Sequence, residues 1–347
     1  MNFDRESDEF TSMNLCKAEN LNSLPLVELH LHLDGSITVP IARRLSKIQG
    51  SALPAETDEE LQELLMVPKD CESLNDFLKC FALPCSLMQT KESLSEAAYL
   101  VAEDMRRQGV FYAEVRWAPQ LHTQKGLSQE EAVLAVLDGL GRSKLKCNTI
   151  LCCMRGDGND AENLETLRVA KKLLVSDGGV VAVDLAGAEA LFPAAGYREL
   201  FAKAKELGLP FTFHAGEAAG PENIRFALEY GASRIGHGVA ACKDEELMQI
   251  LAETGTVLEM CPTSNRQTHA VSSMSEYPFL EYLKRGIKAT LNTDNPAIEG
   301  TSLRGEFEYM QKLFGLTIEQ EKTAIANAID GAFASEETKA WLRSLID

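Results

Sequence analysis

No run of about 20 apolar residues occurs in the 347-residue chain, and the opening MNFDRESDEF contains no basic segment followed by an apolar one. The first absence argues against a membrane-spanning helix, and the second argues against a secretory signal. Basic residues are in deficit as well, with 34 Lys and Arg against 52 Asp and Glu, so the formal net charge is −18. That charge opposes binding to DNA, RNA or an anionic membrane.

Paired cysteines of the C-x-x-C type are also absent. The nine cysteines stand at positions 16, 71, 80, 85, 147, 152, 153, 242 and 261, mostly within apolar stretches. Such a distribution is typical of reduced, buried thiols in a cytosolic protein. The sequence therefore favours a cytoplasmic location and argues against zinc held by thiolates.

The composition, 45% hydrophobic and 25% charged, is that of a soluble globular protein with a large core. Short β-rich segments alternate with helical patterns along the chain. We expect eight strands, at residues 26–34, 111–118, 148–155, 180–186, 210–215, 234–238, 257–262 and 288–294. Eight such units predict an α/β fold, the TIM (β/α)₈ barrel, since a doubly wound open sheet would not normally use eight.

Helix signals separate these strands. Ser128 precedes a helical pattern and has Glu131 three residues on, as in a capping box, and Pro221 and Gly231 bracket another helix. Residues 1–23 are polar and aperiodic, so we expect an extension that can be disordered. Residues 24–347 then form a single barrel domain.

The segment between the first two strands, residues 35–110, is much longer than one barrel helix requires. We therefore expect a long helical insertion after strand one. Within it, Leu74, Phe77, Leu78 and Phe81 follow the i, i+3, i+4, i+7 spacing of one helix face. That face could be ordinary helical core, or it could form an apolar cover over a ligand.

The first strand carries the clearest site signal, in the segment LVELHLHLDG at residues 26–35. Because side chains alternate along a strand, Glu28, His30, His32 and Asp34 share the face opposite the apolar one. In a barrel the apolar face meets the helices, and the other face points to the axis.

Two further residues reach the same end of the barrel. His214 and Asp294 lie on the inward faces of the fifth and eighth strands, at the carboxyl ends where barrel enzymes carry their chemistry. With His30 and His32 they give three imidazoles and a carboxylate, a donor set suited to one zinc ion. The other inward charges, Glu28, Glu114, Arg116 and Asp184, are expected to form an interior ion network. His122 and His269, which end no strand, are interpreted as interior or surface residues.

Seven segments resemble the adenosine deaminase family of the amidohydrolase superfamily in order and spacing, from about residue 24 onward. They are ELHLHLDGS, EVRWAP, DLAGAE, FHAGE, RIGHG, CPTSN and LNTDNP. The resemblance implies a zinc-dependent (β/α)₈ hydrolase of purine salvage. Its reaction converts adenosine and 2′-deoxyadenosine to inosine and 2′-deoxyinosine, with release of ammonia.

The resemblance also assigns roles to residues. It implies one zinc on His30, His32, His214 and Asp294, and catalytic roles for Glu217, His237 and Asp294. It further implies substrate contacts by His32, Asp34, Gly187 and Asn295, and an apolar cover from Leu78 and Phe81. Glu217 would give a proton to purine N1, which requires a raised pKa.

One residue departs from the family pattern, because Asn295 stands where many relatives have a second aspartate. An asparagine amide can donate directly to purine N7, an acceptor in the neutral base. The purine preference therefore stays open, as does the oligomeric state.

Three alternatives are weighed against this function. The first is a related deaminase of adenine, an adenosine nucleotide or a modified adenine nucleoside. A nucleotide would need a phosphate clamp, and only Arg155 and Arg266 stand near strand ends. The second is an inactive nucleoside-binding protein, disfavoured because Glu217 and all four ligands are present. The third, a nucleic-acid deaminase, would require a P-C-x-x-C signature that the chain does not have.

Overall fold

The computed structural model describes residues 24–68, 71 and 73–346, so the predicted extension at residues 1–23 lies outside the described residues. Eight parallel strands form two sheets, β1-β2-β3-β4 and β5-β6-β7-β8. Their bounds are β1 Leu26–His32, β2 Val110–Trp117, β3 Lys146–Met154, β4 Val180–Ala186, β5 His214–Ala215, β6 Arg234–His237, β7 Val257–Met260 and β8 Lys288–Leu291. All eight predicted strands occur, although β5 covers only the last two residues of the predicted 210–215 and β8 ends three residues before the predicted 294.

The two sheets meet at two seams. At one, Leu31 pairs in parallel with Asp294, and the His32 N–H donates to the Asp294 carbonyl at 2.8 Å. At the other, Val183 pairs in parallel with Phe211, just before β5. These bridges continue the parallel order around the axis, so the strands form the predicted barrel.

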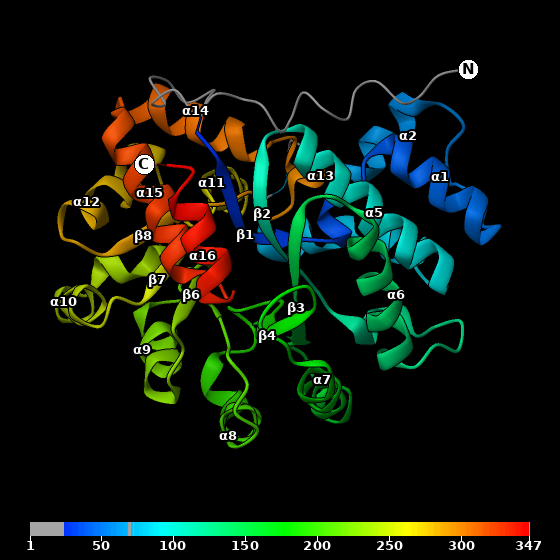
Figure 1. Ribbon diagram of the computed structural model, residues 1–347, viewed down its shortest axis with the longest axis horizontal. Helices are drawn as coiled ribbons and strands as arrows, with labels where there is room; N and C mark the ends of the chain where they lie inside the picture. Colours follow the sequence, from blue (N-terminus) through cyan, green and yellow to red (C-terminus); the bar gives the residue numbers. More distant parts are fainter. Residues whose placement is uncertain (1–23, 69–70, 72, 347) are drawn as a thin grey trace.

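The longer helices between and after the strands surround the barrel, as Figure 1 shows. They are α1 Val39–Gln49, α2 Asp58–Leu65, α5 Lys91–Arg107, α6 Gln129–Arg142, α7 Asp160–Leu173, α8 Arg198–Glu206, α9 Pro221–Tyr230, α10 Glu245–Thr254, α14 Leu303–Phe314, α15 Ile318–Gly331 and α16 Glu336–Arg343. Short elements are η3 Asp34–Ser36, α3 Leu74–Phe77, η4 Leu78–Phe81, α4 Ala82–Ser86, η5 Pro119–His122, η6 Ala194–Tyr197, η7 Val239–Lys243, α11 Pro262–Gln267, η8 Met274–Glu276, α12 Phe279–Lys284 and α13 Pro296–Glu299.

Local sequence explains several helix ends. The Ser128 hydroxyl caps α6 in a reciprocal capping box with Glu131, as predicted. Pro221 begins α9, and Gly231 follows its last residue with φ of 93°, a conformation that costs a glycine little. The fold thus follows the capping signals in the sequence.

The expected helical insertion separates β1 from β2 and contains η3, α1, α2, α3, η4, α4 and α5. Within it, the segment predicted as one continuous helix face is divided: α3 covers residues 74–77, and the tighter 3-10 helix η4 covers residues 78–81. The change of helix type leaves the apolar residues of both parts facing the same cavity.

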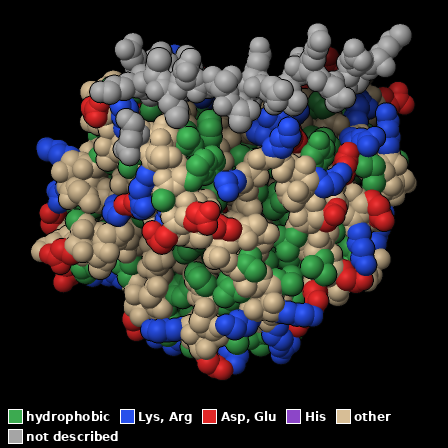
Figure 2. Space-filling model, in the orientation of Figure 1, with side chains coloured by type: hydrophobic (Ala, Val, Ile, Leu, Met, Phe, Trp, Pro, Cys, Tyr) green, Lys and Arg blue, Asp and Glu red, His purple; other side chains and the backbone are tan. Residues whose placement is uncertain are grey.

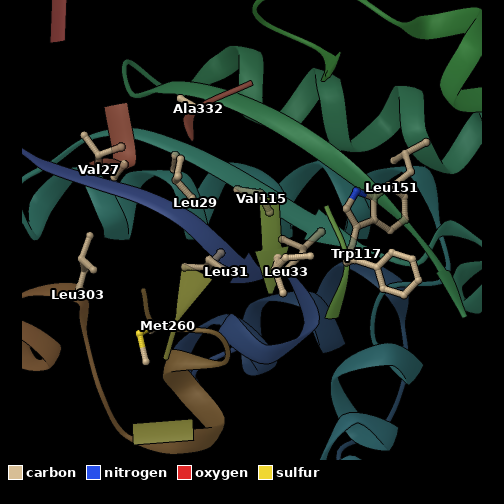
Figure 3. Close-up of a cluster of buried hydrophobic side chains, with 14 of the residues drawn as sticks. Val27, Leu29, Leu31, Leu33, Val115, Trp117, Leu151, Met260, Leu303 and Ala332 are labelled. Carbon is tan, nitrogen blue, oxygen red and sulfur yellow. The ribbon is translucent and has the colours of Figure 1, made fainter. Parts of the chain in front are cut away.

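The outward face of β1 anchors the main core. Val27, Leu29, Leu31 and Leu33 are buried, and Figure 3 shows them clustered with side chains from β2, β3 and the C-terminal region. Those neighbours include Val115, Trp117, Leu151, Leu303 and Ala332. Burial of each such side chain stabilises the fold by roughly 1.5–3 kcal/mol. This packing fixes the alternation that turns the polar face of β1 toward the axis.

On the face shown in Figure 2, basic and acidic side chains are interspersed, without a continuous basic patch. Within the described part of the chain, no helix has the length and apolar character needed to cross a membrane.

Candidate active site

A cavity opens at the carboxyl ends of the strands, beneath the helical insertion. It is lined by ten of the eleven predicted site residues: His32, Asp34, Leu78, Phe81, Gly187, His214, Glu217, His237, Asp294 and Asn295. The eleventh, His30, is fully buried behind His214. Leu74 and Phe77 also line the cavity, so all four apolar residues of the predicted face contribute to its wall.

Four donor atoms converge at the base of the cavity. Nε2 of His214 lies 3.1 Å from Nε2 of His30 and 3.2 Å from Nε2 of His32. Oδ1 of Asp294 lies 3.4 Å from Nε2 of each of those two histidines. Ligand atoms placed about 2.0–2.1 Å from a tetrahedral zinc ion lie about 3.3 Å apart. The spacing therefore fits zinc coordination by the four predicted ligands.

The outer nitrogens of two imidazoles lie close to carboxylates. Nδ1 of His30 lies 2.8 Å from Oε2 of Glu259, and Nδ1 of His214 lies 2.8 Å from Oδ2 of Asp184. Carboxylates in these positions favour a proton on Nδ1, which leaves a lone pair on each Nε2. Two such lone pairs facing each other at 3.1 Å call for a cation between them.

An ion network on the barrel axis supports these carboxylates. Arg116 pairs with Asp184 at 2.9 Å and with Glu259 at 2.6 Å, and Arg234 pairs with Glu259 at 2.6 Å and with Glu114. Three carboxylates and two guanidinium groups leave one negative charge, to which Asp294 adds another. A divalent cation would balance both, which is a second respect in which the donor set fits zinc.

Two members of the network, Arg234 and Glu259, were not identified from the sequence, although the period-2 pattern of β7 could have placed Glu259 inward.

Glu28 was expected in the network but forms no ion pair within the described chain. It accepts hydrogen bonds from the His30 N–H and from the N–H and hydroxyl of Thr293. Burial raises its pKa to about 8, against the opposing effect of these hydrogen bonds.

Glu217 stands beside the four donor atoms with few partners of its own. The Thr268 hydroxyl donates to Oε1 at 3.0 Å, and Oε2 lies 3.5 Å from Nε2 of His237. Burial raises the pKa of Glu217; the nearby His237 lowers it and the charge of Asp294 raises it. The carboxyl is thus suited to hold and release a proton.

A chain of hydrogen bonds orients His237. The Tyr277 hydroxyl donates to Asn265 Oδ1 at 2.8 Å, and Asn265 Nδ2 lies 3.0 Å from Nδ1 of His237. In this arrangement Nδ1 accepts, so neutral His237 carries its proton on Nε2, toward Glu217 and Asp294. His237 and Asp294 both have φ of 64°, a left-handed conformation rare for residues with side chains. Such strain is concentrated at functional sites.

Asp34 and Gly187 lie on the wall of the cavity. Cys85 Sγ donates to Asp34 Oδ2 at 3.6 Å, while Asp34 Oδ1 is buried without a partner in the described chain. Burial raises the pKa of Asp34 to about 6. Gly187, directly after β4, has φ of 103°, which a residue with a side chain rarely adopts. Oδ1 of Asp34 is therefore free to meet a ligand, and without a side chain at Gly187 a ligand can approach the backbone closely.

Asn295 faces Glu299 across the first turn of α13. Its Nδ2 donates to Glu299 Oε1 at 3.2 Å, and its Oδ1 is buried without a partner in the described chain. A Cβ at position 35 would come within 2.1 Å of that oxygen, so Gly35 is required for the close packing.

The two histidines interpreted as interior or surface residues do not line the cavity. His122 lies within hydrogen-bond distance of the Met88 carbonyl, and His269 of the Cys71 carbonyl.

A model of the family described as adenosine deaminase matches residues 25–347. The chain belongs to the adenosine deaminase family.

One relative in this family, an adenosine deaminase of Haemophilus ducreyi, is 46% identical over 323 residues, covering 91% of this chain and 94% of its own. Among solved structures, an adenine deaminase from Arthrobacter aurescens is 29% identical with a TM-score of 0.84, covering 93% of this chain and 98% of that one. An N6-methyl-AMP deaminase from Arabidopsis thaliana is 27% identical with a TM-score of 0.79, covering 94% and 97%. The adenosine deaminase fold therefore extends over nearly the whole chain.

Proposed function

We propose that the protein is a zinc-dependent adenosine deaminase that hydrolyses adenosine and 2′-deoxyadenosine to inosine and 2′-deoxyinosine, with release of ammonia. One observation carries the proposal: four donor atoms converge beside the buried Glu217 at the base of one cavity, with distances of 3.1–3.4 Å from His214 and Asp294 to the two histidines of β1. Membership of the adenosine deaminase family supports it.

His30, His32, His214 and Asp294 would hold one zinc ion per chain. When bound, zinc would supply a water whose pKa is lowered toward ~7, as the nucleophile for purine C6. Nε2–H of His237 and Oδ2 of Asp294, which lie 4.0 Å apart, would orient the water. Because Asn265 occupies Nδ1 of His237, we assign this histidine an orienting role and not that of the general base.

Glu217 would donate its proton to purine N1 as the nucleophile adds to C6. The ring loses aromaticity in that step, so a proton at N1 stabilises the charge that would otherwise develop there. The raised pKa of Glu217 keeps the carboxyl protonated nearer to neutral pH.

The cavity wall offers contacts to the rest of a nucleoside. The free Oδ1 of Asp34 would accept from a sugar hydroxyl, and the backbone of Gly187 would approach the purine edge. Leu78 and Phe81, from η4, would cover the nucleoside and exclude water. These positions favour a purine joined to a neutral sugar.

The principal alternative is a related deaminase of adenine, a nucleotide or a modified adenine nucleoside, since solved relatives include an adenine deaminase and an N6-methyl-AMP deaminase. A nucleotide finds little to bind its phosphate. The Arg155 guanidinium donates to the backbone carbonyls of Phe192, Leu185 and His214, and Arg266 lies over the ring of Tyr309. The acidic Asp34 would in addition repel a phosphate.

The test is a substrate panel of adenosine, 2′-deoxyadenosine, adenine, AMP and N6-methyl-AMP, followed by the loss of purine absorbance. We expect kcat/KM to be highest for the two nucleosides. Preference for adenine or a nucleotide would replace the proposal with the alternative, and no turnover by zinc-loaded protein would favour a binding protein. We further propose a cytoplasmic enzyme with no nucleic-acid or membrane partner, in keeping with its charge and its free cysteines.

A further inference from the structure

The carboxylate of Glu189, three residues after β4, is 1% exposed and has five hydrogen-bond donors around it. Four of them are consecutive backbone N–H groups in the segment that follows β5. Those of Glu217, Ala218 and Ala219 donate to Oε2 at 2.9, 2.8 and 3.2 Å, and that of Gly216 donates to Oε1 at 2.7 Å. The fifth, Asn223 Nδ2, donates to Oε1 at 2.9 Å.

Such a set of donors suits a charged carboxylate. Successive N–H groups that point to one place form an anion-binding concavity, and hydrogen bonds to a charged acceptor are stronger than neutral ones. An ionised carboxylate buried without such partners would be costly. Glu189 therefore accepts the hydrogen bonds of four backbone N–H groups that have no partner in a helix or a sheet and would otherwise need water.

We infer that Glu189 is a positioning residue that fixes the backbone of residues 216–219 and thereby aims the Glu217 carboxyl at the substrate. The inference rests on the proposed deaminase function. Glu189 does not line the cavity, and it forms no hydrogen bond with the four donor atoms. Its effect on the reaction must pass through the segment that it holds.

The geometry of that segment requires an external support. The Glu217 side chain has one hydrogen bond, from Thr268, so its side-chain contacts alone restrain it weakly. Its neighbour Gly216 has φ of 70°, and a Cβ there would come within 2.5 Å of Ile224 Cδ1. The backbone thus turns sharply directly before Glu217, and the four amides facing Glu189 hold the turn in place.

Glu189 also ties together two parts of the proposed site. It lies two residues from Gly187, which would meet the purine edge, and it bonds the backbone N–H of Glu217, which would protonate N1. One side chain therefore sets the distance between a purine contact and the proton donor. Its negative charge acts in the same direction as burial in raising the pKa of Glu217.

The test is Glu189→Gln in the zinc-loaded enzyme. The amide keeps the size of the side chain but turns an N–H group toward backbone N–H donors. A misplacement near 1 Å can cost about a hundredfold in rate, so we expect kcat on adenosine to fall about tenfold to a hundredfold, with KM changed less than threefold and zinc retained. Amide hydrogen exchange at residues 216–219 should accelerate in the same variant.

A double-mutant cycle separates positioning from general structural damage. If Glu189 acts through Glu217, then adding Glu189→Gln to Glu217→Gln should reduce kcat less than twofold further. The control is Asp177→Asn, which removes a carboxylate that accepts from the Ser335 N–H and the Thr338 hydroxyl at α16. This control should leave kcat unchanged.

Normal kcat in Glu189→Gln would overturn the inference. So would a double variant whose loss of kcat equals the product of the losses in the two single variants. If Glu189→Gln does not fold, Asn223→Ala removes one of the five donors and should lower kcat severalfold; an unchanged kcat and unchanged exchange at 216–219 would then overturn it. Failure of the proposed function is distinct, because the wild-type protein would then not turn over adenosine while the exchange measurement still reports on the segment.

Discussion

Two regions of the barrel bury carboxyl groups to a similar depth but shift their pKa values in opposite directions. On the axis, Glu259 is 0% exposed and accepts from Arg116, Arg234, Thr212 and His30. In the cavity above, Glu217 is 8% exposed and has one hydrogen bond. Burial alone would raise the pKa of both groups. The two arginines overcome burial and hold the pKa of Glu259 well below its usual range, whereas the pKa of Glu217 stays raised.

The difference shows how one scaffold can provide a fixed negative charge and a mobile proton within a short distance. The charge of Glu259 stays in place because two guanidinium groups cannot lose a proton, and it orients His30 at the proposed zinc site. Among the described residues, Glu217 forms an ion pair with no arginine, so its carboxyl can be neutral. In enzymes that use carboxyl groups, such opposed environments make one carboxyl a proton donor and keep another ionised.

The largest effect is expected from His214→Ala, which removes a donor between the two regions. His214 contributes Nε2 to the cavity and faces Asp184 with Nδ1, so its loss should abolish both zinc binding and activity. The matched control, His269→Ala, changes an exposed histidine and should alter neither. Elemental analysis and adenosine turnover are the measurements.

Stoichiometric zinc in His214→Ala would contradict the assignment of the ligands. Two metal ions per wild-type chain would contradict the single-zinc proposal, and would direct attention to Asp34, Cys85 and His122, whose donor atoms lie within 4.8 Å of one another.

Next in size is Glu217→Gln, which keeps the shape of the carboxyl but cannot donate its proton. We expect kcat to fall about 10²–10⁴-fold with zinc still bound. In the wild type, activity should decline as pH rises through the raised pKa of Glu217, because only the protonated form is competent. The Gln variant should not show that decline.

The control for burial is Glu321→Gln on α15, another buried carboxyl whose pKa burial raises. Since Glu321 lies outside the cavity, its variant should retain the activity and pH profile of the wild type. Near-normal turnover by Glu217→Gln would mean that another group protonates N1.

Glu259→Gln tests the opposite region. The substitution would remove a negative charge that pairs with two buried guanidinium groups, which costs about 3–5 kcal/mol of stability. It would also weaken the partner of His30, for which we expect a tenfold to hundredfold loss of zinc affinity, the usual range of about 10–100-fold for such outer partners. The control is Glu130→Gln, which breaks a surface pair with Lys172 and should cost at most about 1 kcal/mol. Chemical unfolding and zinc titration measure both effects, and equal losses in the two variants would remove Glu259 from its anchoring role.

The sequence was most informative where the governing physics is local. Period-2 alternation on β1 identified His30 and His32 as inward-facing, and capping residues identified the start of α6 and both ends of α9. The apolar spacing at residues 74–81 predicted the face that lines the cavity but not the change of helix type between α3 and η4.

What the sequence did not reveal depends on contacts between distant residues. Arg116 and Glu259 are separated by 143 positions, and either residue alone is a costly buried charge in a strand. The partners of Glu189 are backbone amides, which every residue possesses, so no sequence pattern distinguishes them. The left-handed φ of His237 and Asp294 likewise follows from the assembled site, because residues with side chains do not favour it.

The smallest effect concerns the rim of the cavity, where Asn295 meets Glu299. Burial, together with the charges of Asp294 and Glu306, raises the pKa of Glu299 well above its usual range. When Glu299 is protonated and the amide turns by half a rotation, the carboxyl donates to Asn295 Oδ1 and Nδ2 is released for purine N7. A substrate with carbon at position 7 would then strand that donor, at a cost of roughly 1–3 kcal/mol, so 7-deazaadenosine should have about tenfold to a hundredfold lower kcat/KM than adenosine. Asn295→Leu should erase most of the difference by penalising adenosine. Equal kcat/KM values in the wild type, or a preference for the deaza compound, would mean that the oxygen of Asn295 faces the purine and that N7 is not read by its amide.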